Sequence, residues 1–345
     1  MISAERTQAI IDAIGESAGQ DYILDPEGHQ ALYRESLPAL AAVLGRSSVQ
    51  VHAKEYATYD TQAGEAQTEY KKYARRARNF TFFTAIVSAL LVMIPGVFEL
   101  FDISKDVREV ISPKLVIGLS LLGVVGAGLA SIALGQIRSR KLLMGWMERR
   151  SKAEELRLLY FDAVTDLEGV AADATEAVLM RLEYFRRYLL EEQKNYYTIR
   201  SQQLEKRADM LLGIVAWTTG LVAIINGSIS VLSGGGNSTG WTSLAGLALI
   251  VQAYSSMRNQ QELSEQNQRN AARYEGTRSI LARLYGRLDA VREAIANGKH
   301  ELLPEFVAAV QEPLSNENRQ WLKEMDRKNS AIGKLEAELE KVQGE

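Results

Sequence analysis

Residues 115–137 read LVIGLSLLGVVGAGLASIALGQI, and this stretch decides the fold. It lies between Lys114 and Arg138 and contains no charged side chain. A helix rises about 1.5 Å per residue, so about 20 apolar residues cross the ~30 Å hydrocarbon core of a bilayer. A buried helix of a soluble protein is the alternative, but so long a helix normally carries charge along one face. The stretch therefore predicts a transmembrane helix.

Two other runs of the chain lack charge over a comparable length. Residues 79–98 form the first, and residues 210–257 form the second, which contains no Asp, Glu, Lys, Arg or His. The second run is too long for a single crossing, and its middle, SGGGNSTG at residues 233–240, has the composition of a turn. We therefore predict an all-α integral membrane protein with four transmembrane helices arranged as two hairpins. The expected spans are residues 79–98, 115–137, 210–232 and 241–257.

Basic side chains gather where the chain enters or leaves the spans on one side. The loop between the first two spans is mostly acidic, and the loop between the last two has no charge. The positive-inside rule then places both termini and the central linker in the cytoplasm. The basic cluster before residue 79 has a second interpretation, which is binding of anionic lipid or nucleotide. We favour the signal for topology, because basic residues flank every span on the predicted cytoplasmic side. The juxtamembrane basic residues are Lys71, Lys72, Arg75, Arg76, Arg78, Arg138, Lys206 and Arg207.

Long helical patterns continue from the spans on the cytoplasmic side. Residues 139–209 must leave the membrane and return, and they offer one reversal near Gly169. We expect neighbouring extensions of similar length to form a stalk bundle. The pattern of extension, hairpin, extension occurs twice, which indicates a loose internal duplication. The predicted domains are an acidic N-terminal helical cap (1–50), a first two-span unit (51–168), a second two-span unit (169–298) and C-terminal amphipathic helices (299–345).

Small residues line one face of the second predicted span. Gly123, Ala127, Ser131 and Gly135 repeat every four residues and therefore share that face. In lipid, small side chains let helix backbones approach closely. We expect this stripe to pack helix against helix, either within the hairpin, between subunits or along a pore. Pro95 predicts a kink in the first span.

The last two predicted spans contain polar side chains but no acidic side chain, lysine, arginine or histidine. Thr218, Asn226 and Gln252 need partners away from lipid, so they either bond one another or line water. Transporters coupled to protons usually keep ionisable residues inside the membrane. The pattern therefore favours a simple or gated conduit.

The sequence shows no catalytic or metal-binding pattern. There is no cysteine, and the three histidines are far apart in sequence. Gly235 to Gly240 has the spacing of a phosphate loop, but Trp241 stands where that loop needs lysine. The net charge of −3 gives no signal for nucleic-acid binding. We expect no enzyme, no metal, no cofactor and no direct binding of nucleic acid.

Four stretches outside the spans carry a family resemblance. Residues 146–154 read WMERRSKAE, residues 188–197 read YLLEEQKNYY, and residues 312–321 read EPLSNENRQW after a third stretch from Ala271 to Tyr285. Together they resemble the SLATT family, which comprises two-transmembrane effector domains found beside nucleotide second-messenger systems in bacterial conflict loci. The resemblance covers residues 54–325 as two tandem units.

The resemblance implies a pore-forming or membrane-disrupting effector of anti-phage defence in the bacterial inner membrane. It further implies a homo-oligomer that a cytoplasmic sensor or a nucleotide-signalling enzyme triggers, with the lipid bilayer as the other partner. A membrane-anchored scaffold that recruits a soluble defence enzyme and conducts no ions is the alternative. A constitutive channel is a third possibility.

Overall fold

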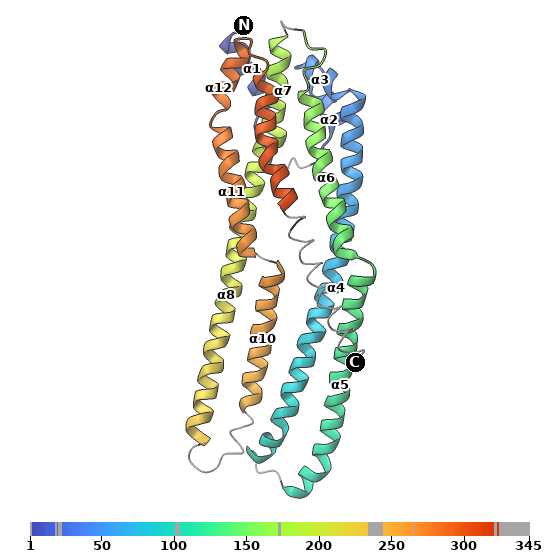
Figure 1. Cartoon of the computed structure of the whole chain (residues 1–345), viewed down its shortest axis with the longest axis vertical. Coiled ribbons are helices and arrows are strands. Elements are labelled where there is room, and N and C mark those ends of the chain that lie inside the picture. Colours follow the sequence, from blue (N-terminus) through green and yellow to red (C-terminus); the bar gives the residue numbers. More distant parts are fainter. Residues whose placement is uncertain are drawn as a thin grey trace. The chain divides into compact units, whose positions relative to one another are not determined.

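The computed structural model is built of helices, which Figure 1 shows in chain order, and no strand occurs among the residues it describes. This confirms the predicted all-α fold. The residues described are 2–17, 19, 23–100, 104–171, 174–233, 244–265, 267–320 and 323. The helices are α1 (Ala4–Ile14), α2 (Pro26–Tyr33), α3 (Pro38–Leu44), α4 (Ser47–Leu100), α5 (Lys105–Ser139), α6 (Leu142–Thr165), α7 (Thr175–Phe185), the π-helix η1 (Arg186–Glu191), α8 (Glu192–Ser233), α10 (Leu244–Glu265), α11 (Asn267–Tyr285), α12 (Leu288–Ala296) and a final helix at 302–320.

The chain divides into two compact units, and neither is a single continuous segment. The core unit comprises Met1–Glu65, Met144–Gln202 and Ala271–Glu345. The span unit comprises Ala66–Leu143 and Gln203–Asn270. This grouping differs from the four sequential segments that the sequence suggested, because distant parts of the chain contribute to each unit.

Helix α7 lies at the centre of the core unit. It packs against α1, α3 and α12, and every side chain from Val178 to Phe185 is buried. A helix that is covered on all sides forms the middle of a hydrophobic core rather than its surface. Ile10 and Ile14 of α1 and Leu40 of α3 belong to the same buried cluster. The N-terminal helices are therefore part of this core.

Local signals in the sequence set the ends of the core-unit helices. Asp25 caps α2 by accepting a hydrogen bond from the backbone N–H of Gly28, and Pro26 fills the first helical position. The predicted reversal near Gly169 is confirmed, since α6 ends at Thr165 and Gly169 adopts a φ of 72°. Gly298, with a φ of 94°, follows the end of α12 in the same way.

In the span unit, helices approach one another closely at single glycines, but many of their apolar side chains are exposed. Gly126 of α5 lies so close to α4 that an added Cβ would sit 2.7 Å from Thr84 Oγ1. Helix α10 also approaches α4, because a Cβ on Gly246 would meet the side chain of Met93. Many other apolar side chains of these helices are exposed, including Val124 at 69% and Trp217 at 83%. Exposed apolar surface of this extent is typical of helices that contact lipid or another protein.

Three helical runs are long and apolar enough to cross a membrane. They are Ser47–Ile94, Lys105–Thr165 and Thr175–Ile229, and they contain most or all of the first three predicted spans. Helix α10, which contains residues 244–257 of the fourth predicted span, is not among them. Residues 241–243 of that span lie outside the described residues. The arrangement of four spans as two hairpins stays a prediction.

Candidate functional site

The centre of the core unit contains a π-helical turn. Segment η1 (Arg186–Glu191) joins α7 directly to α8, so that helical backbone runs without a loop from Thr175 to Ile229. A π-turn adds a residue to the helical repeat, and such turns are often found at functional sites. The turn brings charged side chains, Arg186 and Glu191 among them, into a region where hydrophobic residues surround them.

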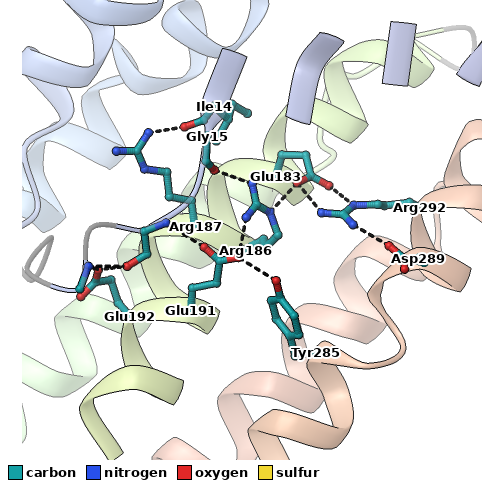
Figure 2. A network of polar contacts seen from close by, with 12 residues as sticks. Ile14, Gly15, Glu183, Arg186, Arg187, Glu191, Glu192, Tyr285, Asp289 and Arg292 are labelled. Carbon is teal, nitrogen blue, oxygen red and sulfur yellow. Dashed lines mark hydrogen bonds and ion pairs between the residues drawn. The ribbon is translucent and has the colours of Figure 1, made fainter. Parts of the chain in front are cut away.

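Arg186 is the centre of a buried polar network, shown in Figure 2. Its Nε donates to Glu183 Oε2 at 2.6 Å, and its Nη1 donates to Glu191 Oε1 at 2.5 Å. Its Nη2 donates to the carbonyl oxygen of Gly15 at 2.6 Å, just after α1. All three donor atoms are thus paired, which offsets the cost of removing the charge from water.

A second arginine enters the network from α12. Arg292 donates through Nε and Nη2 to the two oxygens of Glu183, at 2.5 and 2.9 Å. Tyr285, at the end of α11, donates its hydroxyl to Glu191 Oε1 at 3.1 Å. Glu183 is 1% exposed, and its carboxylate pairs with the buried guanidinium of Arg186 and with that of Arg292, whose side chain is 15% exposed. We call Glu183, Arg186, Glu191, Tyr285 and Arg292 the Arg186 network.

The segment after α1 is bound to the same turn. Backbone N–H groups of Ser17 and Gly19 donate to Glu191 Oε2 at 2.9 Å and to Glu192 Oε1 at 3.1 Å. Arg187 donates to the carbonyl oxygen of Ile14. The last carbonyl groups of a helix have no hydrogen-bond partner within that helix. At the end of α1, the carbonyl oxygens of Ile14 and Gly15 accept hydrogen bonds from Arg187 and Arg186 instead. The π-turn therefore fixes α1 and the segment that follows it.

The two arginines of the network stay charged near neutral pH. Burial lowers the pKa of Arg186, but Glu183 and Glu191 raise it by more, so the net shift is upward. The same balance of burial against Glu183 and Asp289 raises the pKa of Arg292. Both guanidinium groups stay charged, and the network acts as a set of ion pairs.

A second polar cluster lies elsewhere in the core unit and joins residues distant in sequence. The ring of Tyr197 meets that of Tyr274 at 5.2 Å between centroids, and its hydroxyl lies 3.5 Å from Glu317 Oε2. Arg273 Nε lies 3.9 Å from Glu317 Oε1. Glu154, which pairs with Arg150 at 2.5 Å, adds to the electrostatic environment of Tyr197. We call Glu154, Tyr197, Arg273, Tyr274 and Glu317 the Tyr197 cluster.

Burial changes the acid–base behaviour of this cluster. It raises the pKa of Tyr197 well above its usual value, and the nearby carboxylate of Glu317 adds to the effect. Burial also raises the pKa of Glu317, although Arg273 opposes the shift. The members come from all the stretches that resemble the SLATT family, namely 146–154, 188–197, 271–285 and 312–321. The structure therefore brings together residues that the resemblance placed in separate parts of the sequence.

The predicted small-residue stripe of the second span has two different environments. A Cβ on Gly123 would lie 3.5 Å from Val87 of α4, whereas Gly135 has nothing within 4 Å. Ala127 and Ser131 are exposed. The buried small residues of α5 are instead Gly126, Ala130 and Ala133, on the face next to the predicted stripe. The sequence did not indicate that this adjacent face contacts α4.

The other predicted membrane residues are not brought together by the structure. Thr218 donates its hydroxyl to the carbonyl oxygen of Ile214 in its own helix at 2.8 Å, while Asn226 and Gln252 are exposed. Pro95 lies inside α4, and its side chain is outside the described part of the chain. The roles of these residues in a pore or between subunits stay predictions. The basic residues all lie in the span unit, on α4, α5 and α8.

The Arg186 network was not predicted from the sequence. Its partners lie as far as 171 positions apart, so no local spacing reveals them. The charged residues Glu183, Arg186 and Glu191 lie in the sequence among apolar and aromatic side chains, but Arg181, Arg187 and Glu192 do so too, so no sequence signal sets the network residues apart. Comparison of the chain with protein-family models, with curated proteins and with solved structures gave no match.

Proposed function

We propose that this protein is a membrane effector of a bacterial anti-phage defence system. In this proposal it oligomerises and forms or gates a pore when a cytoplasmic nucleotide signal or partner protein acts on its helical stalk. The resemblance to the SLATT family supports the setting. The meeting of its motif residues in the Tyr197 cluster supports a shared role for those motifs.

The observation that carries the proposal is the helical run from Thr175 to Ile229. One end contains the Arg186 network, whose residues come from α7, η1, α11 and α12, and the other end is apolar enough to cross a membrane. A signal that separates α1 or α12 from the π-turn changes the register or direction of this run. Rigid helices transmit such shifts along their length. The proposed lever is therefore η1 with α8.

The proposed topology has four spans, with both termini on the cytoplasmic side of the inner membrane. The exposed apolar side chains of α5 and α8 suit lipid contact or contact with further subunits. Ala127, Ser131 and Gly135 are exposed on the single chain, which leaves their face for a second copy. On this account homo-oligomerisation completes the conducting assembly.

The proposal is tested with a dye sensitive to membrane potential. Cells expressing the chain together with its neighbouring sensor gene are challenged with phage, and we expect depolarisation before lysis. The lever is tested with Gln202→Gly and Glu205→Gly, two exposed positions on α8 where glycine weakens a helix by roughly 1 kcal/mol each. We expect this double variant to insert normally and to lose most of the depolarisation.

The matched control replaces the same two residues by alanine, which keeps the helix intact. Equal depolarisation by the glycine and alanine variants would contradict the lever. An intact potential in all triggered cells, with a soluble enzyme retained on the purified protein, would favour the scaffold. Steady ion flux in liposomes without any trigger would favour a constitutive channel.

A further inference from the structure

A strongly basic surface lies on two neighbouring helices of the span unit. It carries eight basic side chains in residues 69–78 and 138–141, against one carboxylate, that of Glu69. Most of these side chains are exposed. We call Lys71, Lys72, Arg75, Arg76, Arg78, Arg138, Arg140 and Lys141 the basic patch.

Specific contacts hold the two halves of the patch together. Arg140 Nη1 donates to Glu69 Oε1 at 2.9 Å, across from α5 to α4. The guanidinium of Arg140 also lies 6.0 Å from the centre of the Tyr73 ring, and that of Arg76 lies 5.8 Å from it. Like charges in one place repel, so an arrangement that gathers them suits an anionic ligand.

The backbone turns at the patch itself. Helix α5 ends at Ser139, and Lys141 has a φ of 48°, which makes it the one residue other than glycine with positive φ among those described. Lysine adopts the left-handed region rarely. The turn directs Arg138, Arg140 and Lys141 outward, and all three are exposed.

Apolar surface adjoins the patch on the same two helices. Phe83 on α4 and Leu134 and Ile132 on α5 are 41%, 56% and 62% exposed, within a few turns of the basic residues. A ligand that fits both surfaces has a phosphate group joined to hydrocarbon chains. A soluble nucleotide would use the charge but would leave the apolar surface uncovered.

We propose that the basic patch binds the phosphate headgroups of anionic lipids in the cytoplasmic leaflet. The inference rests on the membrane insertion contained in the proposed function. Clusters of four to eight Lys or Arg beside a transmembrane helix bind anionic lipid through just such charge. The positive-inside rule depends only on the number of basic residues beside a span. Binding of a lipid headgroup instead needs basic side chains close together, and the Glu69–Arg140 ion pair holds the basic residues of α4 and α5 close together.

The test uses the full-length protein in a neutral detergent and two probes, fluorescent phosphatidylglycerol and fluorescent phosphatidylcholine. The variant Lys72→Gln, Arg75→Gln, Lys141→Asn removes three charges, and asparagine tolerates the left-handed backbone at position 141. We expect wild type to prefer phosphatidylglycerol, and we expect the variant to bind it at least about tenfold more weakly at low salt. Added ATP should displace little of the lipid.

The matched control Arg34→Gln, Arg283→Gln, Arg287→Gln removes three exposed charges from the core unit instead, and its affinity should stay that of wild type. Equal affinity for the two lipids, equal affinity of the two triple variants, or displacement by ATP at the concentration of the lipid would each overturn the inference. Resistance of the protein to alkaline extraction from membranes is measured in parallel. A chain that resists extraction but shows no lipid preference refutes lipid binding alone, whereas a chain that is extracted refutes the membrane function.

Discussion

Glu183 is the residue that joins the buried Arg186 to the partly exposed Arg292. It accepts hydrogen bonds from Arg186 on one side and from Arg292 on the other, and it is almost completely buried. Removing one partner of a buried ion pair leaves an uncompensated charge, which costs far more than the pair contributes when intact. The stability of the core unit therefore depends strongly on this one carboxylate.

We expect Glu183→Gln to lower the free energy of unfolding by about 3 kcal/mol, because Arg186 and Arg292 each lose one of their two carboxylate partners and the Arg186 guanidinium is buried. Chemical unfolding of the detergent-solubilised protein, followed by circular dichroism, measures the change. Glu176→Gln is the control, since Glu176 lies on the same helix but pairs with Arg6 in solvent. A loss for Glu176→Gln as large as that for Glu183→Gln would contradict this account.

Glu317 makes stability depend on pH in a predictable direction. Burial raises its pKa above the ordinary 4.5, so the folded protein holds this proton more tightly than the unfolded chain does. The ionised carboxylate therefore disfavours folding increasingly as the pH rises from about 4.5 through the raised value. The glutamine of Glu317→Gln stays neutral, so the melting temperature of this variant should rise relative to that of wild type as the pH increases over this range. A difference between the two proteins that is the same at every pH would refute the shift.

Close packing between helices depends on single glycines at the scale of the element. Gly126 lies where α5 meets α4, with Thr84 and Phe83 nearest to the position of an added Cβ. Gly128, two residues later, has nothing within 4 Å. The two glycines therefore separate the effect of helix contact from the effect of helix propensity.

We expect Gly126→Ala to destabilise the packing of α5 on α4 by roughly 1–3 kcal/mol, because the new methyl group overlaps two side chains. Gly128→Ala should be neutral or slightly stabilising, since alanine is the better helix former. Thermal unfolding of the two variants in detergent makes the comparison. Destabilisation by Gly128→Ala, with Gly126→Ala unchanged, would show that α5 packs through a different face.

The sequence predicted helices well and contacts between helices poorly. Uncharged length and the glycine at position 169 are local properties, so the long apolar helices and the reversal could be predicted without knowing any partner. The small-residue stripe was harder, because Gly126 and Ala127 are adjacent in sequence and only three-dimensional packing decides which face meets α4.

The buried polar groups lay beyond sequence reasoning for a different reason. Charged residues such as Glu191 and Glu192 are usually solvated, so nothing in their sequence context indicates that they are buried. Their burial depends on α1 and α12, which come from opposite ends of the chain. The π-turn that orients Arg186 toward them has no reliable local signature.

At the scale of the whole molecule, the account requires four crossings of the bilayer with both ends in the cytoplasm. Three helical runs meet the requirement of length and composition, and the fourth crossing rests on the sequence of residues 241–257. The chain has no cysteine, so a single introduced thiol reports its own location. This makes the topology directly measurable in living cells.

The decisive measurement is labelling of single-cysteine variants with a maleimide that does not cross the inner membrane. The positions are Ser104 and Ser238, in the two loops predicted outside, and Lys152, in the central linker. The account predicts that Ser104→Cys and Ser238→Cys react in intact cells with a permeabilised outer envelope, whereas Lys152→Cys reacts only after lysis. Reaction of Lys152→Cys in intact cells, or protection of Ser238→Cys until lysis, would contradict it.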